Sequence, residues 1–216
     1  MIKFFKSLFG SEGEAGDRIL SHPRDLKKGD FLKFQRLSQP EASDKTFEVF
    51  KVNTYKYHGV NYPEMILKDR DNETLFLMIE EEDGEEYIAL SKKVPKSKIR
   101  EIIPQDGLDR ILKDGTGSQW EFKRKDIANE FKPWIAERYT ETDEDRAIFA
   151  KGDDRHEQTR QDENFRSYTL TDDSDEYAIE IEVYGNNELE MSVTVYHSIN
   201  VIEEILPGRE DRDSWS

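Results

Sequence analysis

One short charged stretch of the sequence holds the side-chain types that bind a hard metal ion. It supplies three carboxylates and an imidazole, from Asp153, Asp154, His156 and Glu157. Oxygen ligands with an imidazole suit Mg²⁺, Mn²⁺ or Ca²⁺, and such a site would belong to a metal-dependent hydrolase. The stretch lacks the Asp-x-Asp-x-Asp-Gly order of a Ca²⁺-binding loop, and carboxylates that follow one another in a loop point in different directions. The alternative is that it forms a solvated charged loop.

The residue types give little support for nucleophilic catalysis or for cofactor binding. The chain has no cysteine, which excludes a thiol nucleophile, a zinc–thiolate site and a disulfide framework. Its four histidines do not combine with a serine and an acid in a recognisable order, and no glycine-rich phosphate loop occurs. We therefore expect no cofactor and assign no catalytic residue.

Aromatic residues suggest a second kind of site, for binding rather than catalysis. Tyr55, Tyr57 and Tyr62 flank a His-Gly pair and could form the rim of a partner-binding surface. Alternating tyrosines are equally what a strand uses to cover one face of a sheet. Both interpretations require a strand followed by a tight turn at this point.

The first ten residues, MIKFFKSLFG, are amphipathic if they form a helix. The apolar face carries Phe4, Phe5, Leu8 and Phe9, with lysines opposite. This pattern predicts a peripheral membrane anchor or a helix that docks in a partner's groove. The alternative is a segment that packs on its own domain. No stretch of the chain is apolar for long enough to span a bilayer as a helix.

The charge balance restricts the partners. The 216 residues include 48 Asp and Glu against 32 Lys and Arg, a formal net charge of −16. Phosphates repel such a surface, so we expect no nucleic acid as a partner. A strongly acidic face could instead imitate nucleic acid toward a basic protein, which is a third functional alternative.

The elements that would position these residues show a weak internal repeat. Residues 62–104 can be laid over residues 165–207 without a gap, at a constant offset of 103. The turn signals coincide: residues 69–72 match residues 172–175, and Asp83-Gly84 matches Asn186-Asn187. Such residues suit tight hairpins because they tolerate a positive φ. Each copy is therefore predicted to form three antiparallel strands.

Alternation within these strands indicates which faces are buried. In residues 177–184, apolar residues alternate with Glu180 and Glu182, which predicts a strand with one face in water. In residues 74–80 both faces are apolar, so that strand should be covered on both sides.

We thus expect a mainly β protein of two related antiparallel β-meander domains, packed as a sandwich or as paired rolls. The expected segments are an amphipathic N-terminal segment with a linker (1–19), a first domain (20–104), a second domain (105–207) with a helical insertion (125–164), and a flexible tail (208–216). The insertion is expected because Ile127, Phe131 and Trp134 recur at helical spacing.

The first half carries a pattern in which Leu26-Lys27-Lys28-Gly29-Asp30 leads a strand, residues 55–67 form an aromatic-rich strand ending in Glu-x-x-Leu, and an acidic hairpin follows. This pattern resembles a bacterial domain-of-unknown-function family, numbered 4178, over roughly residues 26–94, with a possible degenerate second copy. The family has no assigned activity, so the resemblance implies no catalytic residue. Its members often accompany membrane-stress proteins, which implies a role near the inner membrane.

Together these features favour a non-enzymatic protein-interaction or scaffold module in the bacterial cytoplasm, with an unidentified protein partner. It could be held peripherally at the inner membrane through residues 1–10. The metal-dependent hydrolase and the acidic decoy are the alternatives.

Overall fold

The computed structural model describes residues 18–113, 119–121, 127–156 and 160–208, and every structural statement below concerns these residues. The strands are β1 (Phe31–Phe34), β2 (Thr46–Tyr57), β3 (Val60–Lys68), β4 (Thr74–Glu82), β5 (Glu85–Lys93), β6 (Gln119–Glu121), β7 (Arg138–Lys151), β8 (Arg160–Thr171), β9 (Tyr177–Tyr184), β10 (Leu189–Ser198) and β11 (Ile202–Leu206). The helices are α1 (Ile99–Ile102) and α2 (Gln105–Ile111), with 3₁₀ turns η1 (Pro23–Asp25), η3 (Lys132–Trp134) and η4 (Ile199–Val201).

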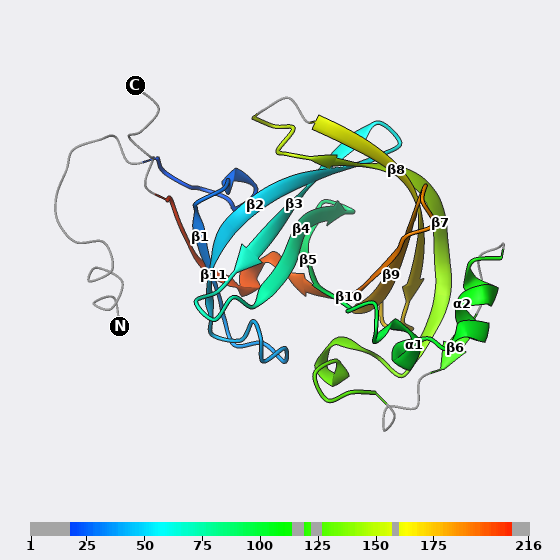
Figure 1. Cartoon of the computed structure of the whole chain (residues 1–216). Coiled ribbons are helices and arrows are strands. Elements are labelled where there is room, and N and C mark those ends of the chain that lie inside the picture. Colours follow the sequence, from blue (N-terminus) through cyan, green and yellow to red (C-terminus); the bar gives the residue numbers. More distant parts are fainter. Residues whose placement is uncertain (1–17, 114–118, 122–126, 157–159, 209–216) are drawn as a thin grey trace.

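The strands form one antiparallel sheet that curls round and closes on itself. Their order is β11-β1-β2-β3-β4-β5-β10-β9-β8-β7-β6, and β2 also pairs with β7. Eight strands, β2 to β5 and β7 to β10, therefore make a ring, which Figure 1 shows nearly end-on. The length of β2 permits this, because Glu48 near its start pairs with β1 while residues 54–56 pair with β7. The expectation of a mainly β, antiparallel fold is confirmed.

The two halves of the chain each contribute four successive strands to this ring. They meet along β5 and β10, where Ser91 lies opposite Thr194 and their hydroxyls are 2.8 Å apart. These two residues are separated by the offset of the sequence repeat. Because the halves share one continuous sheet, the division into two separate packed meander domains is not confirmed, and duplication stays a prediction.

The expected hairpin turns are present. Asn72, Asp83 and Asn187 all have positive φ. Asp69 accepts backbone hydrogen bonds from Asp71 and Glu73, both at 2.9 Å. Asp172, its match in the repeat, accepts them from Glu176 and Tyr177. A carboxylate that satisfies the N–H groups of its own turn explains part of the acidic composition by local structure.

The main hydrophobic core lies on the outer side of the ring wall. In β4, Leu75, Leu77 and Ile79 belong to it, and the alternating Phe76 and Met78 line the interior, so both faces of β4 are covered as expected. Residues of α1, α2 and the segment 127–135 complete this core, and Trp134 is fully buried. In Figure 1, α1 and α2 lie outside the ring, and β1 and β11 lie beside it on the opposite side.

The helical insertion predicted over residues 125–164 is wrong. Apart from the single turn of η3, the described part of this region forms β7 and the start of β8. Period-two positions such as Tyr139 and Glu141 are buried there, and eleven residue pairs join β7 to β8. Pairing across the sheet thus outweighs a short helical pattern that Pro133 already weakens.

None of the helices within the described part of the chain is long and apolar enough to cross a membrane. The predicted amphipathic segment, with Phe4, Phe5, Leu8 and Phe9, lies outside the described residues.

Replacing Leu90 by alanine should lower the free energy of unfolding by about 2–5 kcal/mol, because the fully buried side chain leaves a cavity in the core. Urea unfolding measures this change. Val60 is 51% exposed in β3, so Val60→Ala should change stability by under about 1 kcal/mol. Equal losses in the two variants would contradict the burial pattern.

Candidate functional site

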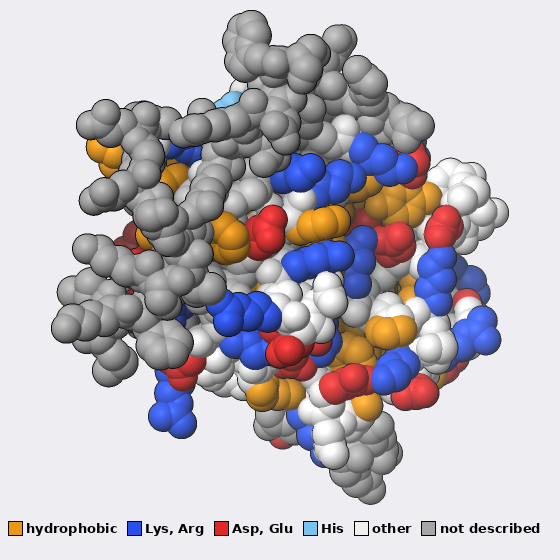
Figure 2. All heavy atoms as spheres, turned by 60° about the vertical axis from the view of Figure 1, so that its left-hand side comes forward, with side chains coloured by type: hydrophobic (Ala, Val, Ile, Leu, Met, Phe, Trp, Pro, Cys, Tyr) orange, Lys and Arg blue, Asp and Glu red, His pale blue; other side chains and the backbone are white. Residues whose placement is uncertain are grey.

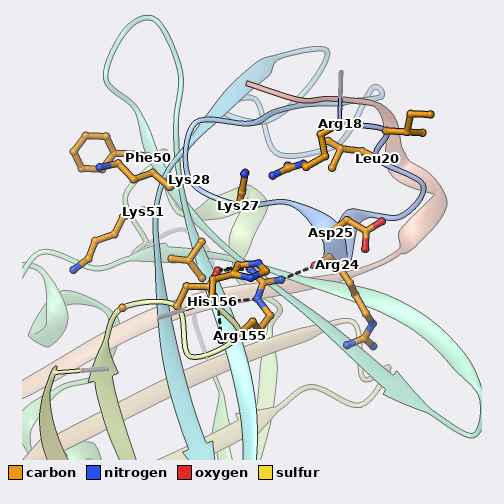
Figure 3. A pocket seen from close by; sticks show the side chains of 14 residues that line it. Arg18, Leu20, Arg24, Asp25, Lys27, Lys28, Phe50, Lys51, Arg155 and His156 are labelled. Carbon is orange, nitrogen blue, oxygen red and sulfur yellow. Dashed lines mark hydrogen bonds and ion pairs between the residues drawn. The ribbon is translucent and has the colours of Figure 1, made fainter. Parts of the chain in front are cut away.

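An open pocket on the outside of the ring gathers positive charge in this acidic protein. Its volume is about 1120 Å³, and six of its lining residues are lysine or arginine against two aspartates. The basic residues are Arg18, Arg24, Lys27, Lys28, Lys51 and Arg155, and His156 joins them. Figure 3 shows Lys28, Phe50 and Lys51 on one side, Arg18, Leu20 and Arg24 on the other, and Arg155 and His156 between them. We call this group the cationic pocket.

Asp30 holds together the chain segments beside this pocket. It is 1% exposed, forms an ion pair with Arg18, and accepts backbone hydrogen bonds from Lys27 and Gly208, both at 2.8 Å. Burial raises the pKa of this carboxyl despite the arginine. Gly29 precedes it with φ +89°, a conformation that side chains rarely adopt. The Gly-Asp pair is therefore structural.

Arg155 forms the inner wall of the cationic pocket. Its Nε and Nη2 donate to the two carboxylate oxygens of Asp153, each at 2.8 Å. Nη1 and Nη2 also donate to the backbone carbonyls of Arg24 and Leu26, at 2.5 and 2.9 Å. This guanidinium, paired with Asp153, holds the pKa of the aspartate below its usual range although burial opposes it. One side chain thus joins residues 24–26 to the turn after β7.

Two lysines of the pocket are left to attract an external anion. Arg18 pairs with Asp30, Arg24 pairs with Glu86, and Asp25 accepts hydrogen bonds from Ser21 and His22. Lys28 and Lys51 have no carboxylate within ion-pair distance among the described residues. Within the described part of the chain, an anion in the pocket would therefore meet two ammonium groups that no carboxylate pairs.

Apolar surface lies beside these charges. Ile19 is 88% exposed and Phe50 is 47% exposed, and both line the pocket. Figure 2 shows hydrophobic side chains among basic and acidic ones on the face that comes forward from the left of Figure 1. A surface that mixes cations with exposed apolar groups suits an anionic, amphipathic partner.

The residues predicted to bind a metal do not converge. The Asp153 carboxylate is bound by Arg155, and Asp154 turns to Asn61, whose Nδ2 donates to it at 2.5 Å. His156 is exposed, with its Nε2 4.0 Å from Asp153. Glu157 lies outside the described residues. Among the residues that the structure describes, no group of three histidines, aspartates or glutamates could hold a metal ion.

The inside of the ring contains a second feature, a chamber of about 50 Å³ lined largely by polar side chains. Its lining comes from seven of the eight ring strands and includes Tyr55, Tyr57, Glu64, Lys93, Ser167, Glu180, Glu182, Glu190 and Ser192. The prediction that the face of Glu180 and Glu182 lies in water is therefore wrong. They alternate with buried isoleucines as expected, but closure of the ring turns their face inward.

Hydrogen bonds cross this inner acidic chamber. Tyr55 from β2 donates to Glu182 Oε1 at 2.9 Å, and Tyr184 donates to Glu182 Oε2 at 2.6 Å. Ser192 donates to Glu180 at 3.1 Å. Lys93, exposed at the mouth of the chamber, pairs with Glu190. The two tyrosines stabilise the charged form of Glu182, whereas Asn53 is the hydrogen-bond partner that lowers the pKa of Glu64.

Burial disfavours ionisation in the chamber. It raises the pKa of Glu64 to about 8 and that of Glu180 to about 7, with nearby carboxylates adding to the effect. Burial also raises the pKa of Glu182, although its tyrosine partners and Lys93 oppose it. Glu64 is 7% exposed. Near neutral pH, therefore, Glu64 is mostly protonated and Glu180 is partly so.

The predicted aromatic rim is wrong for Tyr55, which is 4% exposed. Tyr57 and Tyr62 are half-buried and pack edge-to-face on each other, with ring centroids 6.0 Å apart. Phe165 from β8 contacts both Tyr55 and Tyr57. These tyrosines cover the inner face of the sheet, which was the alternative interpretation.

Sequence reasoning missed the cationic pocket altogether. Its residues come from three stretches, 18–28, 50–52 and 152–156, and none of them is a basic run by itself. The doublet Lys27-Lys28 is the available signal in the sequence, and it lies within the stretch from Leu26 to Asp30 that leads a strand.

Comparison of the chain with protein-family models, curated proteins and solved structures gives no match.

Replacing Glu64 by glutamine should make stability depend less on pH. The pKa of Glu64 is higher in the folded state than its usual 4.5, so the wild-type protein loses this stability as pH rises from about 5 to 8. Above about pH 8, Glu64→Gln should be more stable than wild type by roughly 2–4 kcal/mol, and the two should converge near pH 5. Urea unfolding across this range measures the difference. A constant difference would contradict the burial of an ionisable carboxyl.

Replacing Arg155 by lysine should destabilise the protein by roughly 1–3 kcal/mol, because an ammonium cannot reproduce the four hydrogen bonds of the guanidinium. Thermal unfolding measures this loss. Arg146→Lys at an exposed position of β7 is the matched control and should have little effect. A similar loss in both would show that Arg155 is not a structural tie.

Proposed function

We propose that this protein is a non-enzymatic interaction module that binds an anionic membrane surface at its cationic pocket. In this proposal Lys28 and Lys51 attract the lipid phosphates, and Ile19 and Phe50 contact the apolar edge of the headgroup layer. Residues 1–10 would add an amphipathic anchor, which lies only a few residues before Arg18 in the sequence. A protein partner would then be recruited at the membrane.

The observation that carries the proposal is the local reversal of charge. The whole chain has a net charge of −16, yet the pocket has six lysines and arginines against two aspartates. The three arginines pair with carboxylates, so the lysines carry the local excess of positive charge. A positive concavity on a negative protein attracts anions locally while the remaining surface repels them. Exposed Ile19 and Phe50 at its edge add the apolar contact that a membrane surface offers.

The other functions have less support. A metal-dependent hydrolase would need Asp153, Asp154 and His156 to converge, and the two aspartates instead have separate partners. An acidic decoy would need a continuous negative face, whereas basic side chains are interspersed with acidic ones over the face shown in Figure 2.

Co-sedimentation with vesicles tests the proposal. The full chain should bind phosphatidylcholine vesicles doped with phosphatidylglycerol, bind pure phosphatidylcholine weakly, and lose binding at high salt. Each lysine near an anionic membrane contributes about 1 kcal/mol to the binding free energy. The double variant Lys28→Glu/Lys51→Glu should therefore weaken binding roughly 30-fold or more. Deleting residues 1–10 should weaken binding to both kinds of vesicle, because it removes apolar contact.

The control is Arg100→Glu/Lys113→Glu, which changes the net charge equally at exposed positions outside the pocket. If this control loses as much binding as the pocket variant, the attraction is general and the pocket is not the site. Absence of binding to anionic vesicles by the full chain would overturn the proposal.

A further inference from the structure

The ring is closed by its shortest ladder. Three residue pairs join β2 to β7: Thr54 with Ala150, Tyr55 with Phe149, and Lys56 with Ile148. Every other pair of neighbouring ring strands that the structure describes is joined by four or more residue pairs. We call these three pairs the β2–β7 seam. It is where the closed sheet should open most easily, since the fewest residue pairs must separate there.

One strand connects this seam to both features of the site. On β2, Lys51 and Val52 line the cationic pocket, and Tyr55 points into the inner acidic chamber. Between them, Thr54 Oγ1 donates to the carbonyl of Gly152 at 2.9 Å and accepts from the N–H of Asp154 at 3.1 Å. Gly152 also lines the pocket. A shift of β2 at the seam therefore moves both walls of the pocket.

The charge inside the chamber depends on proton binding. Glu64 on β3 faces Glu180 and Glu182 on β9, Lys93 on β5 and Glu190 on β10. Glu80 on β4 and Asp145 on β7 act on the same interior through Glu180 and Tyr57. The phenols that face it, among them Tyr55, Tyr57 and Tyr184, stay neutral because burial and the carboxylates raise their pKa values.

Ionisation of Glu64 and Glu180 would place two more negative charges beside Glu182 and Glu190, and Lys93 is the only lysine among the described residues that line the chamber. Repulsion within a closed ring acts on every ladder, and the weakest one yields first. Tyr55 on β2 donates to Glu182 on β9 across the chamber. Movement of the Glu182 carboxylate therefore acts directly on β2 at the β2–β7 seam.

We propose that the inner acidic chamber is a proton-sensitive latch, in which loss of protons from Glu64 and Glu180 loosens the β2–β7 seam and weakens the cationic pocket. The protonated state keeps the ring closed and holds Lys51 and Gly152 in place. The deprotonated state draws water into the chamber and lets the seam open locally. The effect on the pocket rests on the proposed function, whereas the opening of the seam does not.

Amide hydrogen exchange of the full chain tests the latch, with rates corrected for the intrinsic effect of pH. Between about pH 6 and pH 8.5, protection at residues 54–56 and 148–150 should fall by roughly 10-fold or more, while amides of the β4–β5 ladder keep theirs. Glu64→Gln and Glu180→Gln should each reduce the fall, and the double variant should abolish it. Two independent variants are used so that failure of one to fold does not remove the test.

Glu85→Gln is the matched control, since this glutamate is exposed in the β4–β5 hairpin; it should behave as wild type. Equal protection at the seam at both pH values, or an equal fall throughout the ring, would overturn the latch. Vesicle binding should weaken with rising pH more in wild type than in the double variant. An equal loss of binding in both would show that ionisation in the chamber does not affect the pocket. Absence of vesicle binding at any pH would overturn the proposed function alone.

Discussion

Closure of the sheet at the β2–β7 seam is the constraint on which the rest of this structure depends. Without those three residue pairs, the same strands would form an open sheet with one face in water. With them, that face becomes the wall of an interior, and its glutamates and tyrosines must find partners there. The hydrogen bond from Tyr55 to Glu182 exists because closure brings β2 opposite β9.

Closure also explains why the interior is polar and the main core lies outside. The apolar residues of the ring strands that form the main core point away from the centre and are covered by α1, α2 and the segment around Trp134. An interior of this width is filled by side chains, and here tyrosines and glutamates fill much of it. Buried carboxyls are tolerated because some remain protonated and others accept hydrogen bonds.

The cationic pocket is formed by loops that lie against the outside of the closed sheet. Asp30 ties residues 18–28 to Gly208, which follows β11, and Arg155 ties the turn after β7 to residues 24–26. These contacts bring lysines and arginines from distant parts of the chain around one concavity. The acidic composition of the whole chain therefore gave a misleading picture of this surface, because a sum over the sequence contains no information about position.

The sequence by itself determined several of the strands and their turns, but not β7 and the start of β8, where it predicted a helical insertion. Period-two alternation located β9, an apolar run located β4, and Asp, Asn and Gly located the hairpins, because these signals are local properties of the backbone and its neighbours. It also correctly distinguished the two faces of β9. Only the tertiary structure decided that the face of Glu180 and Glu182 points inward, since alternation separates two faces without saying which one a closed ring encloses. The pocket and the burial of Tyr55 were equally beyond the sequence, because both depend on contacts between residues far apart in the chain.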